Sequence, residues 1–570
     1  SPVASHLVYL VGHRLTSENI ILFLDAYQNR TPLLIAELWV FPLMLRLALL
    51  ERISRYSAIT GARQREKELA DLWANRLIQA SHIGSDVFDA LLGQLELDRK
   101  QVTPHFIARL AEQVQKEEGA LAPMQSWLEA RTGGALADAI RREHAHEAHD
   151  QMLIASAIGS LRELSELQYP AVVEAVSRIE RTLRRDPAGV HAKSDFDTRD
   201  RCRRAVETTA RRSALSELEV AELAVQLAEG APWGSRERCV AYYLINDGVE
   251  ELHRRCRGHK LPWQEREVRF LYRHATSIYL SGLFLLTAGL AMAFLGPAAS
   301  AGISWPLLGA LALLVAIPAS ELATFLFQTW LTWVIPPRTL PKLEFQDRIP
   351  DEYRTLVVVP MMLLTPDAIR GEIEKLEVRY LSNPDPNLCF ALLADFTDAP
   401  QPAMPEDAEL LQVALNGIRE LNARYGEDPF FLFHRNRVWC ETEQSWIGWE
   451  RKRGKLEELN RYLLGEESGV RLLAGLPPGN IRYVITLDSD TQLPHGSARR
   501  LIETIAHPLN RIELTEDGRN RLRGYTIIQP RVGITLPSAT ATRFTRLFSD
   551  ARGTDPYCQA VSDVYQDLFR

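Results

Sequence analysis

The stretch RYVITLDSDTQLP (Arg482 to Pro494) joins a short apolar run to two acidic residues, Asp488 and Asp490. Other apolar runs rich in β-formers lie around it: TLVVVPMML (355–363), LCFALLADF (388–396), FFLFHR (430–435) and YTIIQPRV (525–532). Segments with helical spacing separate them, such as EDAELLQVALNGIRELNARYG. This alternation predicts a doubly wound parallel sheet, in which ligands bind beyond the carboxyl ends of the strands.

Acidic residues stand at two of these strand ends. Asp395 closes one run and Asp398 follows it, while Asp488 and Asp490 close another. An Asp-x-Asp pair on a turn can hold Mg²⁺ or Mn²⁺ through oxygen ligands and leave positions for substrate phosphates. A bound divalent ion neutralises a departing diphosphate. A solvated or structural turn is the commoner use of such a pair.

A basic helix start, ERKRGKLEELN (450–460), provides the matching positive charge. A helix N-terminus beside several cations suits a diphosphate, although a solvated helix face is the usual reading of such a turn. The cations of this turn are Arg451, Lys452, Arg453 and Lys455. The tryptophans that precede it either line a sugar site or pack against the sheet: Trp439, Trp446 and Trp449.

Ahead of this α/β region the chain carries a membrane signal. ATSIYLSGLFLLTAGLAMAFL (275–295) has no charge and is long enough to span a bilayer. A second span begins at Trp305 and continues past Glu321 to about residue 335, so we predict a transmembrane hairpin over 270–337. Glu321 is either an intramembrane functional group or a carboxylate near the interface. Basic residues on both flanks place them in the cytoplasm: Arg266, Arg269, Arg273, Arg338 and Lys342.

The first half of the chain reads as helical. Residues 1–57 form an apolar segment, buried or membrane-interfacial, whose charges interrupt any full span. Residues 58–262 have the spacing of a soluble α-helical domain, with a capping box at Ser216 and Glu219. In RREHAHEAHD (141–150) the histidine spacing differs from that of HExxH zinc sites, which favours a solvated helix face.

Composition narrows the class of protein. The 570 residues are 46% hydrophobic and 24% charged, which excludes a wholly disordered chain. The net charge of −7 gives no drive towards nucleic acid, and six scattered cysteines suggest reduced thiols. The chain begins at Ser1 without Met and stops at Arg570 just after a helical run, so we expect a fragment of a longer protein.

These motifs carry a resemblance. Residues 345–570 resemble a nucleotide-sugar glycosyltransferase of the processive synthase type, with a GT-A-like fold, on the Asp after the second strand, RGKLEELN and LDSDT. The whole chain is more similar to the N-terminal part of cyclic β-1,2-glucan synthases. The segments that carry this similarity include LIAELWVFPLMLRLALLE, RIERTLRRDPAGVHAKSDFDTRDRCRR, EVRYLSNPDPNLCFALLADFTDAP, IGWERKRGKLEELNR and DPYCQAVSDVYQDLF.

The resemblance implies a bacterial inner-membrane hexosyltransferase whose catalytic domain faces the cytoplasm. Glucose would pass from UDP-glucose, with inversion, to a growing β-1,2-glucan, with Mg²⁺ or Mn²⁺ as cofactor and the lipid bilayer as a further partner. Asp395, or else Asp398, would contact the uridine part of the donor. Asp488 and Asp490 would hold the donor and the metal, with Asp490 the direct ligand. The cations implied at the diphosphate are Lys455, Arg451 and Arg453.

The sequence also departs from the family pattern. Inversion needs a general base, which in such synthases follows the Asp-x-Asp strand at a long interval together with a QxxRW motif, and no QxxRW motif occurs in this sequence. We therefore expect the base beyond Arg570, an incomplete transferase domain, and no turnover by this chain alone. The alternative hypothesis is a membrane-tethered scaffold with a degenerate transferase fold. The aspartates that follow Asp490 include Asp517, Asp550, Asp555, Asp563 and Asp567.

Overall fold

The structure is a computed structural model. It describes residues 2–12, 14–98, 103–116, 122–132, 136–256, 258, 262–335, 339–515, 521–530, 535–548 and 568–569. The chain divides into two compact units, Ser1–Arg181 and Thr182–Arg570. Arg338 and the acids Asp517, Asp550, Asp555, Asp563 and Asp567, named above, lie outside the described residues.

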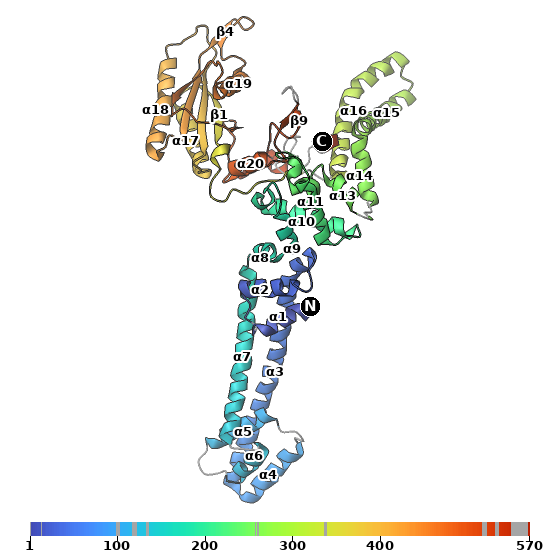
Figure 1. The fold of residues 1–570 in the computed structure, drawn as a ribbon, viewed down its shortest axis with the longest axis vertical. Helices are drawn as coiled ribbons and strands as arrows, with labels where there is room; N and C mark the ends of the chain where they lie inside the picture. The colour runs from blue at the N-terminus through green and yellow to red at the C-terminus, as the bar shows by residue number, and fades with distance from the viewer. Residues whose placement is uncertain are drawn as a thin grey trace. The chain divides into compact units, whose positions relative to one another are not determined.

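The first unit is helical throughout its described residues. Two long helices, α3 (Ile35–Ile83) and α7 (Leu136–Glu166), pack along each other (Figure 1). The expected boundary between residues 57 and 58 falls inside α3, because its helical spacing continues through both the apolar and the charged segment. The other helices are α1 (Pro2–Leu10), α2 (Ser17–Gln28), α4 (Ser85–Asp98), α5 (Pro104–Gln115), α6 (Ala122–Thr132), α8 (Tyr169–Val176) and α9 (Arg178–Leu183).

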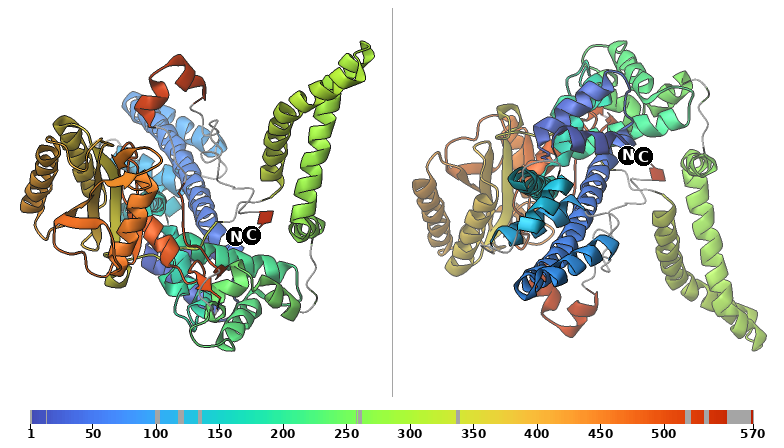
Figure 2. Two further views of the ribbon diagram at one scale, coloured as in Figure 1. Left: turned by 90° about the horizontal axis from the view of Figure 1, so that it is seen from above. Right: turned by 90° about the horizontal axis from the view of Figure 1, so that it is seen from below.

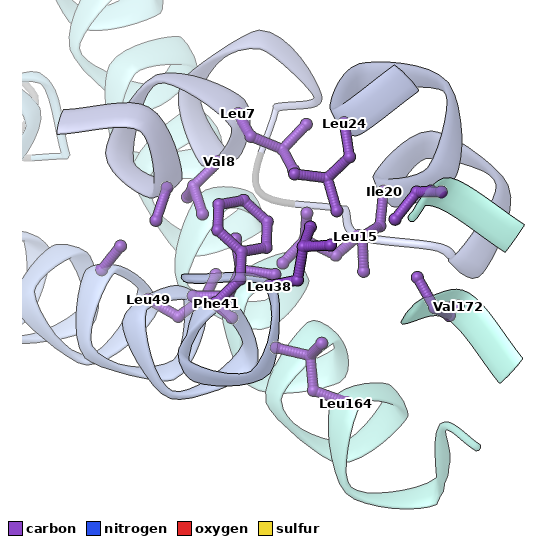
Figure 3. Packing of buried hydrophobic residues seen from close by; sticks show 14 of the residues in the cluster. Leu7, Val8, Leu15, Ile20, Leu24, Leu38, Phe41, Leu49, Leu164 and Val172 are labelled. Carbon is purple, nitrogen blue, oxygen red and sulfur yellow. The ribbon is translucent and has the colours of Figure 1, made fainter. Parts of the chain in front are cut away.

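A hydrophobic core closes one end of this unit (Figure 3). Leu7, Ile20 and Leu24 of the first two helices meet Phe41 of α3 and Val172 of α8. The apolar segment 1–57 is therefore buried on one face. Its opposite face on α3 stays exposed at Val40, Leu43, Leu47 and Leu50.

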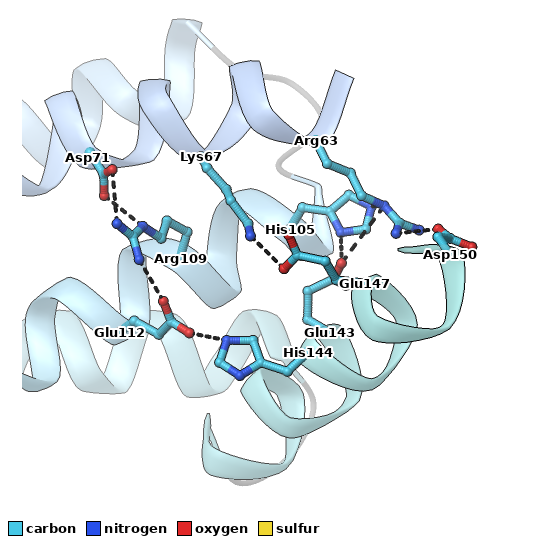
Figure 4. A network of polar contacts seen from close by, with 10 residues as sticks. All are labelled: Arg63, Lys67, Asp71, His105, Arg109, Glu112, Glu143, His144, Glu147 and Asp150. Atoms are coloured by element: carbon cyan, nitrogen blue, oxygen red, sulfur yellow. Dashed lines mark hydrogen bonds and ion pairs between the residues drawn. The ribbon is translucent and has the colours of Figure 1, made fainter. Parts of the chain in front are cut away.

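The histidine-rich stretch of α7 faces its neighbours rather than solvent alone (Figure 4). Glu147 pairs with Lys67 of α3 at 2.6 Å, and Asp150 pairs with Arg63 of α3 at 2.5 Å. His144 contacts Glu112 of α5. The prediction that residues 141–150 form a solvated helix face was thus incomplete, because the acids of this stretch are spaced to meet cations on adjacent helices.

The second unit begins with a small helical group. The predicted capping box forms: Ser216 Oγ accepts from Glu219 N, and the Glu219 carboxylate accepts from Ser216 N. The helices of this group are η1 (His191–Lys193), α10 (Phe196–Arg211), α11 (Glu217–Glu229), η2 (Arg236–Arg238), α12 (Val240–Ile245) and α13 (Val249–Arg255), followed by α14 (Trp263–Arg273).

Two helices of the described chain are long and apolar enough to cross a membrane, α15 (Ala275–Ser300) and α16 (Trp305–Val334). They pack against each other, and a Cβ on Gly282 would lie 2.4 Å from the Phe327 ring, so the glycine makes room for the aromatic side chain. Only 6% and 11% of their most apolar windows are buried. They therefore differ from the core helices of a water-soluble protein.

The α/β region contains a five-stranded sheet in the order β6-β3-β2-β1-β7. Its strands are β1 (Thr355–Leu363), β2 (Leu388–Phe396), β3 (Phe430–Arg435), β6 (Val470–Ala474) and β7 (Tyr483–Thr486). Four of them run parallel, and the edge strand β6 is antiparallel to β3. The prediction of a parallel sheet was wrong at this edge, where β6 pairs antiparallel with β3.

Helices cover both faces of this sheet (Figure 2). α17 (Pro366–Ser382) and α18 (Asp407–Tyr425) pack together, and their tyrosines contact Phe390 and Phe430. Leu459 of α19 (Arg451–Leu464) joins Val358, Ala391 and Phe433 on the other face.

The remaining elements are short. Residues 525–530 are the described part of the predicted run YTIIQPRV, and they form no strand. They pair with no strand of the large sheet, whose described order ends at β7. The remaining elements are η3 (Asp351–Tyr353), β4 (Val438–Cys440), β5 (Ser445–Ile447), α20 (Ser497–Ala506), β8 (Glu513–Leu514), β9 (Arg521–Arg523), α21 (Leu536–Thr540) and α22 (Arg543–Phe548).

Candidate ligand site at the carboxyl edge of the sheet

The predicted acidic residues meet where the carboxyl ends of β1, β2, β3 and β7 lie side by side, because these strands run in the same direction. We call this end of the sheet its carboxyl edge. Asp395 on β2 is in register with Met362 on β1 and with Arg435 on β3. β7 ends at Thr486, so the turn that carries Asp488 and Asp490 leaves from the same edge.

Asp395 is the buried centre of this edge, with 4% of its surface exposed. Arg435 donates to both of its oxygens, at 2.8 Å to Oδ1 and 3.0 Å to Oδ2. Lys455 Nζ lies 3.1 Å from Oδ2 and donates to the Met361 carbonyl at 2.8 Å. Three of the four lone pairs of the carboxylate are thus used, and one remains on Oδ1.

Lys455 is not a surface cation. Its exposed fraction is 3%, and burial lowers the pKa of its ammonium group, while the Asp395 carboxylate opposes that shift. The resemblance implied a phosphate contact for this residue. The structure instead directs its ammonium group to Asp395 and a backbone carbonyl, because the first turn of α19 packs tightly on the sheet.

That close approach depends on glycine and on an unusual backbone. Glu450 and Arg451 both have φ of 49°, in the left-handed region, directly before the regular part of α19. A Cβ on Gly454 would lie 2.0 Å from the Trp449 carbonyl oxygen, and one on Gly448 would lie 2.9 Å from Asp395 Oδ2. Strained backbone of this kind is concentrated at functional sites.

The other three cations at the start of α19 are exposed and lie beside acids. Lys452 pairs with Asp488, while Arg453 pairs with Glu450 at 2.9 Å. Arg451 Nη2 lies 3.0 Å from Asp398 Oδ2. The first turn of α19 therefore bridges two strand ends, with Lys455 at Asp395 and Lys452 at Asp488.

Arg379 on α17 was not among the predicted site residues, yet its side chain bonds the backbone of the Asp488–Thr491 turn. Its guanidinium donates to the carbonyl oxygens of Ser489 at 2.9 Å and of Thr491 at 2.9 and 3.2 Å. One signal was available: Arg379 follows Ile373 and Leu376 at helical spacing on the buried face of α17. An arginine at a core position of an amphipathic helix indicates a specific partner.

The acidic turn fits a divalent ion only in company with a ligand. No group of three or more histidine, cysteine or acidic side chains gathers to hold a metal among the residues that the structure describes. Asp488 and Asp490 are two carboxylates on one turn. Mg²⁺ is commonly held by one or two carboxylates together with substrate phosphates and water, so this donor set suits a site that a diphosphate completes.

Two of the three tryptophans lie on a separate two-stranded ribbon, and Trp449 follows it. Trp439 and Trp446 face each other across β4 and β5, with ring centroids 5.8 Å apart. Backbone bonds of 2.8 and 2.9 Å join Trp446 to Ala399, just after Asp398. Trp439 and Trp449 are half-exposed. The ribbon thus presents aromatic surface near the acidic edge instead of burying it against the large sheet.

The fold and the candidate site together define a protein with an α/β region, in which acidic and basic side chains gather at the carboxyl edge of the sheet. An apolar helical hairpin precedes this region in the chain. No protein-family model matches the chain. It is 34% identical to cyclic β-(1,2)-glucan synthase NdvB of Rhizobium meliloti (strain 1021), over 97% of its own length and 20% of that protein's. The chain thus spans a fifth of this much longer relative, and it is related to the glucan synthases over nearly all of its residues.

Proposed function

We propose that this chain is the donor-binding part of a membrane-bound hexosyltransferase that makes β-1,2-glucan. The donor would be UDP-glucose and the acceptor a growing glucan, with inversion at the transferred carbon. The observation that carries the proposal is the first turn of α19, which links Asp395 and Asp488 at the carboxyl edge of the sheet. The similarity to a glucan synthase supports the same reaction.

The geometry supports a separate role for each of these residues in donor binding. Asp395 keeps one lone pair on Oδ1 for the uridine part, while Lys455 and Arg435 hold its carboxylate in place. The exposed cations of α19 are free to turn from carboxylates to a diphosphate, which offers the same charge with more oxygens. We therefore assign the diphosphate to Arg451, Lys452 and Arg453.

Asp488 and Asp490 would hold Mg²⁺ or Mn²⁺. The ion, when bound, neutralises charge on the leaving diphosphate. Lys452 would move from Asp488 to the phosphates as the ion arrives, so that the carboxylate and the cation each exchange one partner for another.

We place the protein in the bacterial inner membrane, with the sheet on the cytoplasmic side. The support is the pair of apolar helices and the basic residues that flank them, such as Arg269 and Lys342. UDP-sugars are cytoplasmic metabolites, so a cytoplasmic site also matches the proposed donor.

The proposal is tested with membranes that carry the protein in its natural, uninterrupted form. They are supplied with labelled UDP-glucose and Mn²⁺ or Mg²⁺, and UDP-galactose serves as the donor control. Asp490→Asn removes one metal ligand at nearly constant volume. Metal-dependent glucose polymer from the wild type, absent from the variant at equal protein level, is the expected result.

Two outcomes would contradict the proposal. Unchanged glucan in Asp490→Asn would remove the acidic turn from the reaction. No incorporation from any UDP-sugar, with the protein intact and inserted, would favour the scaffold hypothesis instead.

A further inference from the structure

Helix α17 and the acidic turn after β7 are far apart in sequence but bound together in space. Beyond Thr486 the chain has no strand or helix until Ser497, so its carbonyl groups need partners from elsewhere. Two buried side chains supply them, one on α17 and one at its C-cap. Arg379 donates to the carbonyls of Ser489 and Thr491, and Asn383 donates to that of Leu493 at 3.2 Å.

Arg379 is suited to this task by its shape. A guanidinium presents several N–H groups in one rigid plane, whereas an ammonium group is a point charge on a flexible stem. Nε bonds Thr491, and Nη2 bonds both Thr491 and Ser489, with a longer contact of 3.4 Å to Asp488. The carbonyls on either side of Asp490 are thus held by one group.

One hydrogen-bond donor of the guanidinium group is unused within the described part of the chain. Arg379 is 4% exposed, and its Nη1 has no hydrogen-bond acceptor among the residues that the structure describes. A buried donor without a partner is unusual in a folded protein and indicates a role beyond packing. Asp490 and Glu372 are the charged groups that act on Arg379 electrostatically.

We propose that Arg379 is a positioning residue, which holds the Asp488–Thr491 turn so that Asp488 and Asp490 present their carboxylates together to a divalent cation. This inference rests on the metal role proposed above. Arg379 acts through the backbone of the turn and needs no contact with substrate. Groups that orient metal ligands in this way typically change metal affinity or activity 10–100-fold when replaced.

Three variants of α17 test this proposal in the intact protein, purified in detergent. Arg379→Gln removes both the charge and the planar set of N–H donors, which we call the fork, whereas Arg379→Lys keeps the charge alone. Arg370→Gln is the matched control, since Arg370 is exposed on the same helix and pairs with Asp367 at 2.7 Å. Mn²⁺ binding in the presence of UDP, which supplies the diphosphate, is read by electron paramagnetic resonance, and hydrogen exchange is read by mass spectrometry on peptides that cover residues 487–495.

We expect both Arg379 variants to exchange faster at the turn and to bind Mn²⁺ at least roughly tenfold more weakly, while Arg370→Gln matches the wild type. The Thr491 amide is the key reporter, because it closes the turn on the Asp488 carbonyl at 3.0 Å. Global unfolding temperature is measured beside them, so that a general loss of stability is recognised by faster exchange everywhere.

Each contrary result has a separate meaning. Unchanged exchange at the turn would overturn the positioning role, whatever the Mn²⁺ result. Faster exchange with unchanged Mn²⁺ affinity would overturn the link to the cation, and full rescue by Arg379→Lys would overturn the need for the fork. If the wild type binds no Mn²⁺, the proposed metal role fails, and the exchange data still decide whether Arg379 holds the turn.

Discussion

Lys455 and Asp395 form a buried ion pair across the carboxyl edge of the sheet, with Nζ 3.1 Å from Oδ2. One residue comes from the start of α19 and the other from the end of β2. Arg435 shares the same carboxylate, so one acid is compensated by two cations. A charged group this deep needs such partners, since an unpaired buried charge is strongly destabilising.

The first prediction concerns this buried cluster. Arg435→Met should destabilise the second unit by about 3–5 kcal/mol, because it removes a buried partner of both Asp395 and Glu458. Lys455→Met should cost less, about 1–3 kcal/mol, because Arg435 still neutralises Asp395. Denaturant unfolding in detergent measures both.

Arg453→Met is the control for that series. Arg453 is exposed and pairs with Glu450 one turn away, so its loss should change stability by less than about 0.5 kcal/mol. Equal costs for all three variants would contradict the buried-cluster account.

The second prediction concerns the glycine that lets α19 approach the sheet. Gly454→Ala places a methyl group 2.0 Å from the Trp449 carbonyl, so the left-handed turn must shift, at a cost of about 1–3 kcal/mol. Glucan synthesis should fall with it, because Lys452 moves away from the proposed diphosphate site.

The matched control is Gly371→Ala, a helical glycine of α17 with open space around it. It should be neutral or stabilise the protein by up to about 1 kcal/mol, as expected for Gly→Ala in a helix. If both substitutions behave alike in thermal unfolding and glucan synthesis, the steric argument fails.

The third prediction separates binding from stability at Lys452. Its pair with Asp488 is exposed, so Lys452→Met should leave the unfolding temperature nearly unchanged. Loss of a charged hydrogen bond to the diphosphate should raise KM for UDP-glucose by roughly ten- to a hundredfold, the equivalent of about 1.5–3 kcal/mol.

Arg461→Met provides the comparison, since Arg461 lies exposed further along α19 and pairs with Glu457. Its KM should equal that of the wild type. A normal KM in Lys452→Met would remove this lysine from the diphosphate site.

The fourth prediction is a pH dependence at His507, the fully buried residue that ends α20. Burial lowers the pKa of its imidazole to about 3, assisted by Arg201 and Arg511. Its Nδ1 accepts from Leu509 N at 3.2 Å, and Nε2 lies 3.5 Å from Ser194 Oγ. The folded protein therefore holds the neutral ring.

In the unfolded chain the same histidine titrates near pH 6.5, so between pH 6.5 and about 3 the unfolded state binds the extra proton. Stability contributed by His507 is complete above pH 6.5 and falls below it, by up to about 1.4 kcal/mol per pH unit. His507→Asn keeps an acceptor and does not titrate. Unfolding measured from pH 7.5 to 5 should show a shallower slope for this variant, and identical slopes would exclude His507 as a source of the pH dependence.

Much of the architecture was accessible from local pattern. Alternating runs predicted β1, β2, β3 and β7 but missed β6, and Asp395 and Asp488 were placed at the carboxyl ends of the strands because strand ends can be read from the sequence. Hydropathy alone located the two apolar helices, and the Ser216 cap needs only residues three apart. These features depend on neighbours in the chain, which periodicity and spacing record.

Tertiary packing decided the rest. Four cations stand together at the start of α19, but the rotation of that helix, set by Leu459 against the sheet, buries Lys455 and leaves Lys452 exposed. Arg379 meets a turn 110 residues away, and β6 pairs antiparallel with β3, although the helix before it would also allow a parallel crossover. These features depend on contacts between segments that are distant in the chain, and no local sequence pattern records the energies of such contacts. The sequence alone therefore predicted which residue types gather at the carboxyl ends of the strands, and the tertiary structure decided which residue each of them contacts.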